Sequence, residues 1–311
     1  MSINEDPFIE TVLHTTDFSA ASELAFAHAL AVAVLRRASL TILHVGSDDR
    51  ADWTRFPAVR SLLERWHLLE PGSSQDAVFE KVGVRVTKRA ISSRFPALAV
   101  ADYLDEAPTD LLVVATEGRD GAARWLHGSV AEAMARWSRT MTLFVPAGTD
   151  RSIVSLTDGN LTFNNVLIPI DRAPDASKAI EFARRASEIA GDGNVKITLL
   201  HVGTAAGTPR VRAEDGTRWT LARMCREGDP VTEILAAADV VRADLVVMPT
   251  AGRQGVFEAL RGSTTERVLR GLSCPLLAVP ESRSAFDTAP TWVPQVGSLE
   301  YTFNSRSTGL P

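Results

Sequence analysis

Short apolar runs alternate with longer helical patterns along most of the 311-residue chain. The runs are five to seven residues long, rich in β-branched side chains and apolar throughout, which is typical of strands buried on both faces. Their alternation with helical stretches indicates βαβ units and a parallel sheet. We predict strands at 11–16, 40–45, 84–90, 110–115 and 141–145, and then at 165–170, 196–202, 218–224, 244–248 and 275–279.

The second set of strands repeats the first. TILHVG at Thr41–Gly46 returns as TLLHVG at Thr198–Gly203, and the DLLVV that begins at Asp110 returns as DLVVM at Asp244. A fixed order of matching segments indicates a duplicated domain. We therefore predict an α/β protein of two similar doubly wound domains, residues 1–150 and 151–284, followed by an irregular tail at 285–311.

The first half is longer by about 23 residues, which lie between its second and third strands. This insertion, at about 52–75, carries apolar side chains at helical spacing from Trp53 to Leu69. The spacing predicts one helix that covers a face of the sheet.

Composition narrows the class of protein. Apolar residues make up 45% of the chain, charged residues 23%, and the net charge is −5, which disfavours binding to a nucleic acid backbone. The two cysteines favour a reducing compartment, so we expect a cytoplasmic protein, and no apolar run is long enough to span a membrane. The sequence has no phosphate-binding P-loop, no nucleophile elbow and no metal-ligand spacing, so we predict neither catalytic residues nor a metal site.

A glycine frame follows the fourth strand of each half. GRDGAARWLHGSVAE begins at Gly118, and GRQGVFEALRGSTTE begins at Gly252. Ligands of doubly wound sheets bind beyond the carboxyl ends of strands where the strand order reverses. If the first and fourth strands are neighbours, the frame and the aspartate after the first strand (Asp17 or Asp171) face one crevice. The simpler interpretation is a helix-capping box, formed by Ser129 and Glu132 or by Ser263 and Glu266.

Together, TDFS after the first strand, LHV, DLVVM and the G-9x-GS spacing resemble the universal stress protein family over about residues 1–280. The resemblance implies five-stranded parallel sheets in the order 3-2-1-4-5 with helices on both faces. It also implies pairing through the fifth strands, which a tandem chain can make internally as a pseudo-dimer; a homodimer is a further alternative. One branch of the family binds ATP or AMP, with or without magnesium, and another branch binds no nucleotide.

The resemblance further implies a set of nucleotide-binding residues in each half. In the first half Asp17 and Val45 would contact the adenine, and the glycine frame would hold the phosphates. The frame retains two of the three elements of the family's pattern, because Ala115 and Pro249 replace the first glycine. Proline is the heavier change, so the first half is the better candidate. The full set is Asp17, Val45, Gly118, Gly128, Ser129, Val130, Asp171, Val202, Gly252, Gly262, Ser263 and Thr264.

We thus expect a stress-response regulator that binds an adenine nucleotide and is not an enzyme. Two alternatives stay open. One is a protein-interaction module with a vestigial pocket and no cofactor, and the other is a slow ATPase.

Overall fold

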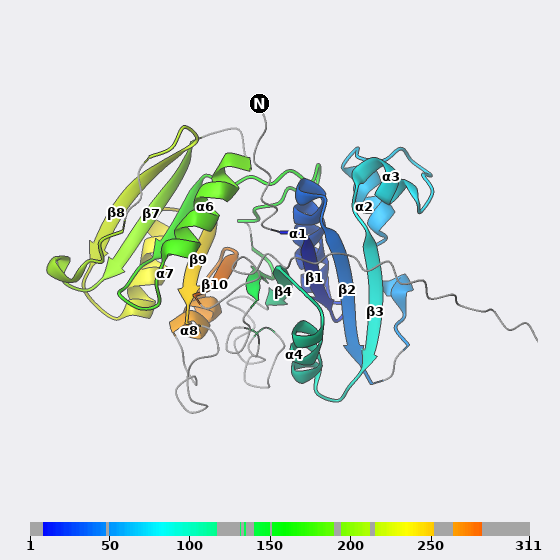
Figure 1. The fold of residues 1–311 in the computed structure, drawn as a ribbon, viewed down its shortest axis with the longest axis horizontal. Coiled ribbons are helices and arrows are strands. Elements are labelled where there is room, and N and C mark those ends of the chain that lie inside the picture. The colour runs from blue at the N-terminus through cyan, green and yellow to red at the C-terminus, as the bar shows by residue number, and fades with distance from the viewer. Residues whose placement is uncertain are drawn as a thin grey trace, which may run out of the picture.

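Ten strands form one continuous sheet in a computed structural model that describes residues 9–47, 50–116, 131, 134, 140–149, 151–189, 194–211, 215–251 and 264–281 (Figure 1). The order across the sheet is β3-β2-β1-β4-β5-β10-β9-β6-β7-β8. The strands of the first half are β1 (Thr11–Thr16), β2 (Ser39–Gly46), β3 (Val86–Ser92), β4 (Leu111–Thr116) and β5 (Met141–Pro146). Those of the second half are β6 (Asn165–Pro169), β7 (Val195–Val202), β8 (Trp219–Arg226), β9 (Leu245–Thr250) and β10 (Leu276–Pro280).

All strand pairs within a half are parallel, and the two halves meet through an antiparallel pair, β5 with β10. Leu143 lies opposite Leu277 at this junction. Because the last strands of both halves pair there, neither presents an open edge at the centre, and the free edges are β3 and β8. The predicted fold class, two similar α/β domains with parallel sheets, is confirmed.

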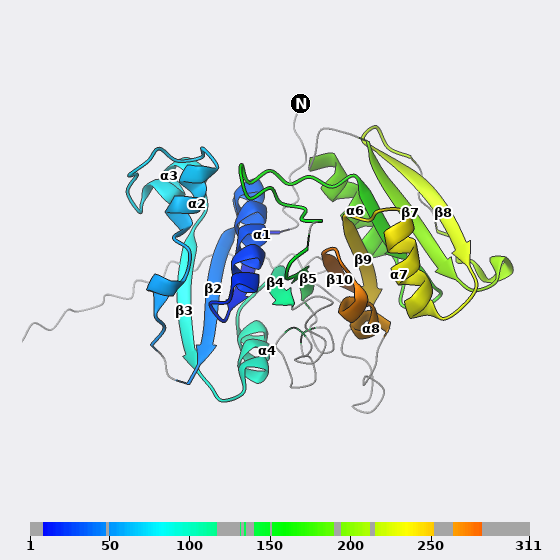
Figure 2. The same ribbon diagram turned by 180° about the vertical axis from the view of Figure 1, so that it is seen from behind.

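Helices cover both faces of the sheet, as the two views show (Figures 1 and 2). The helices of the first half are α1 (Ala20–Arg36), α2 (Val59–Arg65), α3 (Ala77–Val82) and α4 (Pro96–Glu106). Those of the second half are α6 (Ser177–Ile189), α7 (Pro230–Val240) and α8 (Thr264–Gly271). One core lies between the sheet and α1, α2 and α6, and the other lies beneath α4, α7 and α8. No helix in the described residues combines the length and hydrophobicity needed to cross a membrane.

The aspartates that repeat before each glycine frame, Asp110 and Asp244, are structural. Asp110 Oδ2 accepts hydrogen bonds from the backbone N–H groups of Glu10 and Thr11 and from the Thr11 hydroxyl, each at 2.9 Å. Asp244 Oδ2 accepts two backbone N–H bonds at the start of β6, at 2.7 and 2.9 Å. Each carboxylate therefore ties the beginning of the fourth strand of its half to the beginning of the first.

The insertion differs from its prediction as a single helix. It forms a 3₁₀ turn, η1 (Trp53–Arg55), and then α2, because Pro57 lies between them. Proline forces the preceding residue out of helical geometry, and Phe56 accordingly has extended backbone angles (φ −95°, ψ 139°). The apolar stripe is nevertheless buried against the α1 face of the sheet, with Leu63 and Trp66 among the buried residues.

The segment between the halves packs against this insertion. Val154 and Leu161 form an antiparallel bridge, and Val154 is buried. The indole N–H of Trp66 donates to the carbonyl oxygen of Leu156 at 3.3 Å. Gly159 has a positive φ of 74°, and a Cβ there would lie 2.4 Å from the Trp66 ring, so this position requires glycine.

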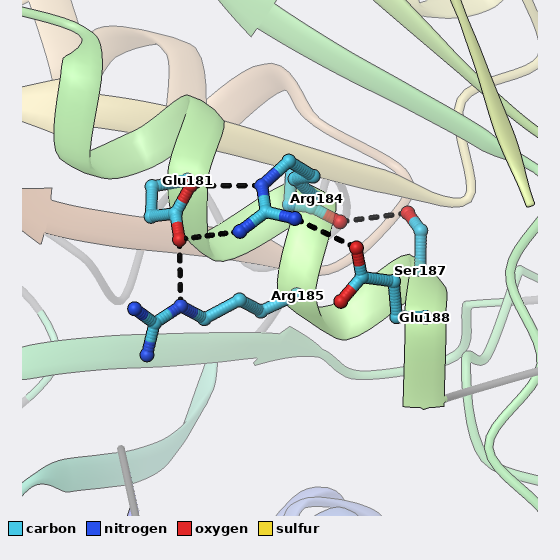
Figure 3. A network of polar contacts seen from close by, with 6 residues as sticks. Glu181, Arg184, Arg185, Ser187 and Glu188 are labelled. Carbon is cyan, nitrogen blue, oxygen red and sulfur yellow. Dashed lines mark hydrogen bonds and ion pairs between the residues drawn. The ribbon is translucent and has the colours of Figure 1, made fainter. Parts of the chain in front are cut away.

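Helix α6 is held by side chains along its outer surface (Figure 3). Arg184 donates from Nε and Nη2 to the two carboxylate oxygens of Glu181, at 2.9 and 2.8 Å, and from Nη1 to Glu188 at 2.7 Å. Arg185 adds a bond to Glu181 at 2.7 Å. The Arg184 hydrogen bond is the main reason that the pKa of Glu181 falls to about 2. The opposite side of α6 packs Ala179 into the core, so the helix is amphipathic.

Candidate functional site

The carboxyl ends of β1 and β4 lie side by side in the first half. The two strands are parallel neighbours, with Val12 opposite Leu111 and His14 opposite Val113. The strand order switches sides at β1: the chain continues from β1 to β2 on one side and later returns to form β4 on the other side. Such a point leaves a crevice beyond the strand ends. Asp17, one residue past β1, is exposed at this edge.

The turn that carries Asp17 is fixed by its own hydrogen bonds. Asp17 Oδ1 accepts the N–H of Ser19 at 2.9 Å, and the hydroxyl of Thr16 accepts the N–H of Phe18 at 3.0 Å. Ser19 then caps α1, because its hydroxyl accepts the N–H of Ser22 at 3.2 Å. Phe18 has a positive φ of 63°, which is unusual for a residue with a bulky side chain. The sequence TTDFSAAS thus forms a tight turn that presents one carboxylate beyond the strand.

An aromatic cluster supports this turn from the α1 face. The ring of Phe18 lies 4.4 Å from that of His44, and Trp53 contacts Phe18 edge-on at 5.6 Å. His44 Nδ1 donates to the carbonyl oxygen of Thr16 at 2.9 Å, so β2 also holds the end of β1. The sequence pattern does not reveal this cluster, because Phe18 and Trp53 come from segments separated by α1 and β2. Val45, the predicted adenine contact, is half-buried on β2, opposite Ile91 of β3.

The second half repeats the neighbouring strands but not the turn. β6 and β9 are parallel neighbours, with Leu167 opposite Val246, and Asp171 is exposed just beyond β6. Asp171 Oδ1 accepts the N–H of Arg172, the next residue, at 2.8 Å, whereas Asp17 Oδ1 accepts the N–H of Ser19, two residues later. Helix α6 begins six residues after Asp171, and α1 begins three after Asp17, so the second turn is longer. Val202 is half-buried at the end of β7.

The phosphate side of the predicted site lies largely outside the described residues. This applies to Gly118, Gly128, Ser129, Val130, Gly252, Gly262 and Ser263. Thr264 is exposed as the first residue of α8, and the buried carboxylate of Glu266 forms an ion pair with Arg270. Of the two residues that replace the family's first glycine, Ala115 lies opposite Val145 and Pro249 opposite Val279. Pro249 lies beyond the last pair that joins β6 to β9, where a missing N–H costs the sheet least.

The described residues offer no cluster of three His, Cys, Asp or Glu side chains that could hold a metal ion. Both cysteines are free thiols, Cys225 exposed and Cys274 buried. Lys88 extends over the rings of Trp53 and Phe56, at 5.2 and 5.4 Å from their centroids, and partial burial lowers its pKa.

The ends of β1 and β6 provide the exposed carboxylates of Asp17 and Asp171 together with backbone groups. Such groups suit reversible binding of a polar ligand.

Comparisons with known proteins agree on one family. The sequence model of the Universal stress protein family matches residues 9–146 and 212–280. A universal stress protein of Mycobacterium tuberculosis is 25% identical over 299 residues, which cover 86% of this chain and 95% of that relative. One of Methanocaldococcus jannaschii is 42% identical over 57 residues, 18% of this chain and 34% of that protein's length. The crystal structure of a universal stress protein from Archaeoglobus fulgidus matches with a TM-score of 0.55 at 18% identity, over 88% of this chain and 97% of that one.

Proposed function

Because the chain belongs to the universal stress protein family, we propose that it is a stress-response regulator that binds an adenine nucleotide, ATP or AMP. The site would lie in the crevice beyond the carboxyl ends of the first and fourth strands of a half. The observation that supports this proposal is the pairing of β1 with β4, which puts Asp17 at the same sheet edge as the end of β4, the strand that the glycine frame follows in the sequence. We propose no catalytic residue.

In the proposed site the adenine lies near Asp17 and the backbone of Val45, and the phosphates lie along the glycine frame. Asp17 Oδ1 is used by the turn, so the second carboxylate oxygen would accept the ligand's hydrogen bond. Gly118, Gly128, Ser129 and Val130 would supply backbone N–H groups and a hydroxyl to the phosphates.

The same set in the second half is Asp171, Val202, Gly252, Gly262, Ser263 and Thr264. We propose the first half as the preferred site, because Ala115 retains a backbone N–H that Pro249 lacks. The shorter, internally bonded turn after β1 also supports this choice, since it holds Asp17 in one position before the ligand arrives.

We further propose that residues 1–150 and 151–284 act as an intramolecular pair, with 285–311 as a separate tail. The antiparallel β5–β10 contact supports this arrangement, because it would let one chain present both crevices in a fixed relation. Two free thiols and no disulfide among the described residues support a cytoplasmic location for this regulator.

Isothermal titration of the full chain with ATP, AMP and cyclic AMP tests the proposal. We expect saturable binding of at least one of them, abolished by Gly118→Leu, whose side chain would occupy the space of the phosphates. The matched variant Gly252→Leu should leave most of the binding intact. Loss of binding in Gly252→Leu alone would reverse the assignment of the halves. No binding by the unaltered protein at tens of micromolar would refute the proposal.

The replacement of the first glycine in both halves favours a second function. A protein-interaction module with a vestigial pocket would tolerate both Ala115 and Pro249. Under that function all three nucleotides would fail to bind, and the Gly118→Leu variant would behave like the unaltered protein in every assay of partner binding.

A further inference from the structure

The insertion and the edge strand β3 enclose a hollow of about 490 Å³ on the first half. Its lining residues come from the start of α2, from α3 and from the beginning of β3. Figure 1 shows these three elements close together at one edge of the sheet. This volume is in the range of small-molecule sites in proteins. The hollow lies where α3 leads into β3, whereas the proposed nucleotide crevice lies beyond the carboxyl ends of β1 and β4.

Three cations line the hollow with one carboxylate. The cations are Arg60, Arg85 and Lys88, and the carboxylate is Asp76. Arg60 donates to the carbonyl oxygen of Ser73 at 2.9 Å, and the guanidinium of Arg85 lies 5.3 Å from the centroid of the Phe79 ring. In the part of the chain that the structure describes, none of the three forms an ion pair with a carboxylate. The hollow therefore has a positive charge that its own walls do not neutralise.

Apolar side chains complete the lining between the cations. Val78 is buried at the floor, and Phe79 at the rim is 55% exposed, which is high for a phenylalanine. Guanidinium groups bind phosphate through paired N–H donors, and aromatic faces stack on flat apolar groups. A ligand that satisfies both features carries a phosphate and a planar or apolar body.

Strand β8, the edge strand of the second half, shows which cations an edge strand carries in the half that has no insertion. Lys88 lies opposite Ile42 of β2, and its counterpart in the sheet register is Arg223, opposite Leu199 of β7. Charged side chains on an edge strand prevent sheets from joining, and both residues meet that need. Arg223, however, donates to the carbonyl oxygen of Val211 at 3.4 Å, and the counterpart of Arg85 is the uncharged Thr220. The excess of cations thus accompanies the insertion.

From these observations we propose that the hollow between α2, α3 and β3 is a binding site for a small phosphate monoester with an aromatic or apolar body. Arg60, Arg85 and Lys88 hold the phosphate, and Phe79 and Val78 contact the body. The insertion thereby gives the first half a ligand site that the second half lacks, separate from the proposed nucleotide crevice.

Saturation-transfer NMR of the full-length protein with phenyl phosphate tests this site, with phenol observed directly as one partial probe and inorganic phosphate added as a competitor as the other. We expect phenyl phosphate to bind with a dissociation constant below about 1 mM and each partial probe to bind at least about tenfold more weakly. Arg85→Ala should weaken binding about tenfold, and the Arg85→Ala/Lys88→Ala variant should abolish it. Arg85 is exposed, so Arg85→Ala should keep the melting temperature of the unaltered protein, whereas the double variant also loses the contacts of Lys88 with the Trp53 and Phe56 rings and should melt slightly lower.

Two matched controls separate the hollow from general surface charge. Arg89→Ala removes a cation from the same strand outside the lining, and Arg223→Ala removes the register counterpart of Lys88. Both should bind phenyl phosphate normally, as should the crevice variant Gly118→Leu. An equal loss in either arginine control, a loss in Gly118→Leu, or no binding at several millimolar would overturn the proposal.

Discussion

Replacing His14 with isoleucine should make the protein less sensitive to acid. His14 is fully buried on β1, its Nδ1 donates to the carbonyl oxygen of Val113 at 3.1 Å, and its Nε2 has no partner among the described residues. Burial lowers the pKa of His14 from 6.5 to about 4, although the Val113 carbonyl and the charge of Asp17 oppose this. Ile168 occupies the equivalent position in the second half and is equally buried, so the protein itself shows that isoleucine fits.

The sign and size of the effect follow from proton linkage. Below pH 6.5 the unfolded chain takes up a proton at this histidine and the folded chain does not until about pH 4, so stability is lost as the pH falls through this window. One such histidine removes about 2 kcal/mol at pH 5 and about 3 kcal/mol in full. His28 is also buried, with its pKa lowered to about 4, so it contributes a second loss that the variant retains.

Urea denaturation of the unaltered and His14→Ile proteins at pH 8, 6 and 5 measures the difference. The variant should be at least as stable at pH 8, because the unpaired Nε2 is gone, and its loss between pH 8 and 5 should be about 2 kcal/mol smaller. His67→Asn, at an exposed position, is the control for removal of an imidazole. Equal acid sensitivity of the His14→Ile and unaltered proteins would refute the reasoning.

Four further substitutions test how the fold is held together. Asp110→Ala should lower the free energy of unfolding by about 2–3 kcal/mol, since it leaves two backbone N–H groups without their acceptor. Asp244→Ala should act similarly, and unchanged urea midpoints would contradict both predictions. Gly159→Ala should lower the melting temperature, because its Cβ would meet the Trp66 ring at 2.4 Å, and a Trp66→Ala background should relieve the clash. Phe144→Ala at the β5–β10 junction should cost about 3–5 kcal/mol in thermal or urea unfolding, because this side chain is fully buried; a cost below 1 kcal/mol would show that the junction repacks freely.

Most of the strands could be predicted from local pattern because central strands such as β4, β5 and β10 are buried on both faces, although the edge strands β3 and β8 are largely exposed. All ten predicted strands occur, and none of their bounds differs from the predicted one by more than two residues. The insertion was predicted less well, because helical spacing continued through Pro57 and only the proline's effect on Phe56 broke the helix. The predicted roles of Asp17 and Val45 rest on a motif, and the structure adds that Asp17 is exposed, that Val45 is half-buried, and that a turn holds Asp17.

By itself, the sequence determined that the protein is duplicated, that each half is a doubly wound α/β unit, and where the glycine frames lie. These features are local or repetitive, so the spacing of apolar residues and the repeated motifs are enough to reveal them. The family resemblance implied pairing of the fifth strands, but only the tertiary structure decided that β5 and β10 pair antiparallel within one chain. Only the tertiary structure, too, decided that the insertion reaches Phe18 and that three cations surround one hollow beside β3. Those contacts join residues far apart in the chain, and long-range packing is decided by which surfaces complement each other when the whole chain is compact.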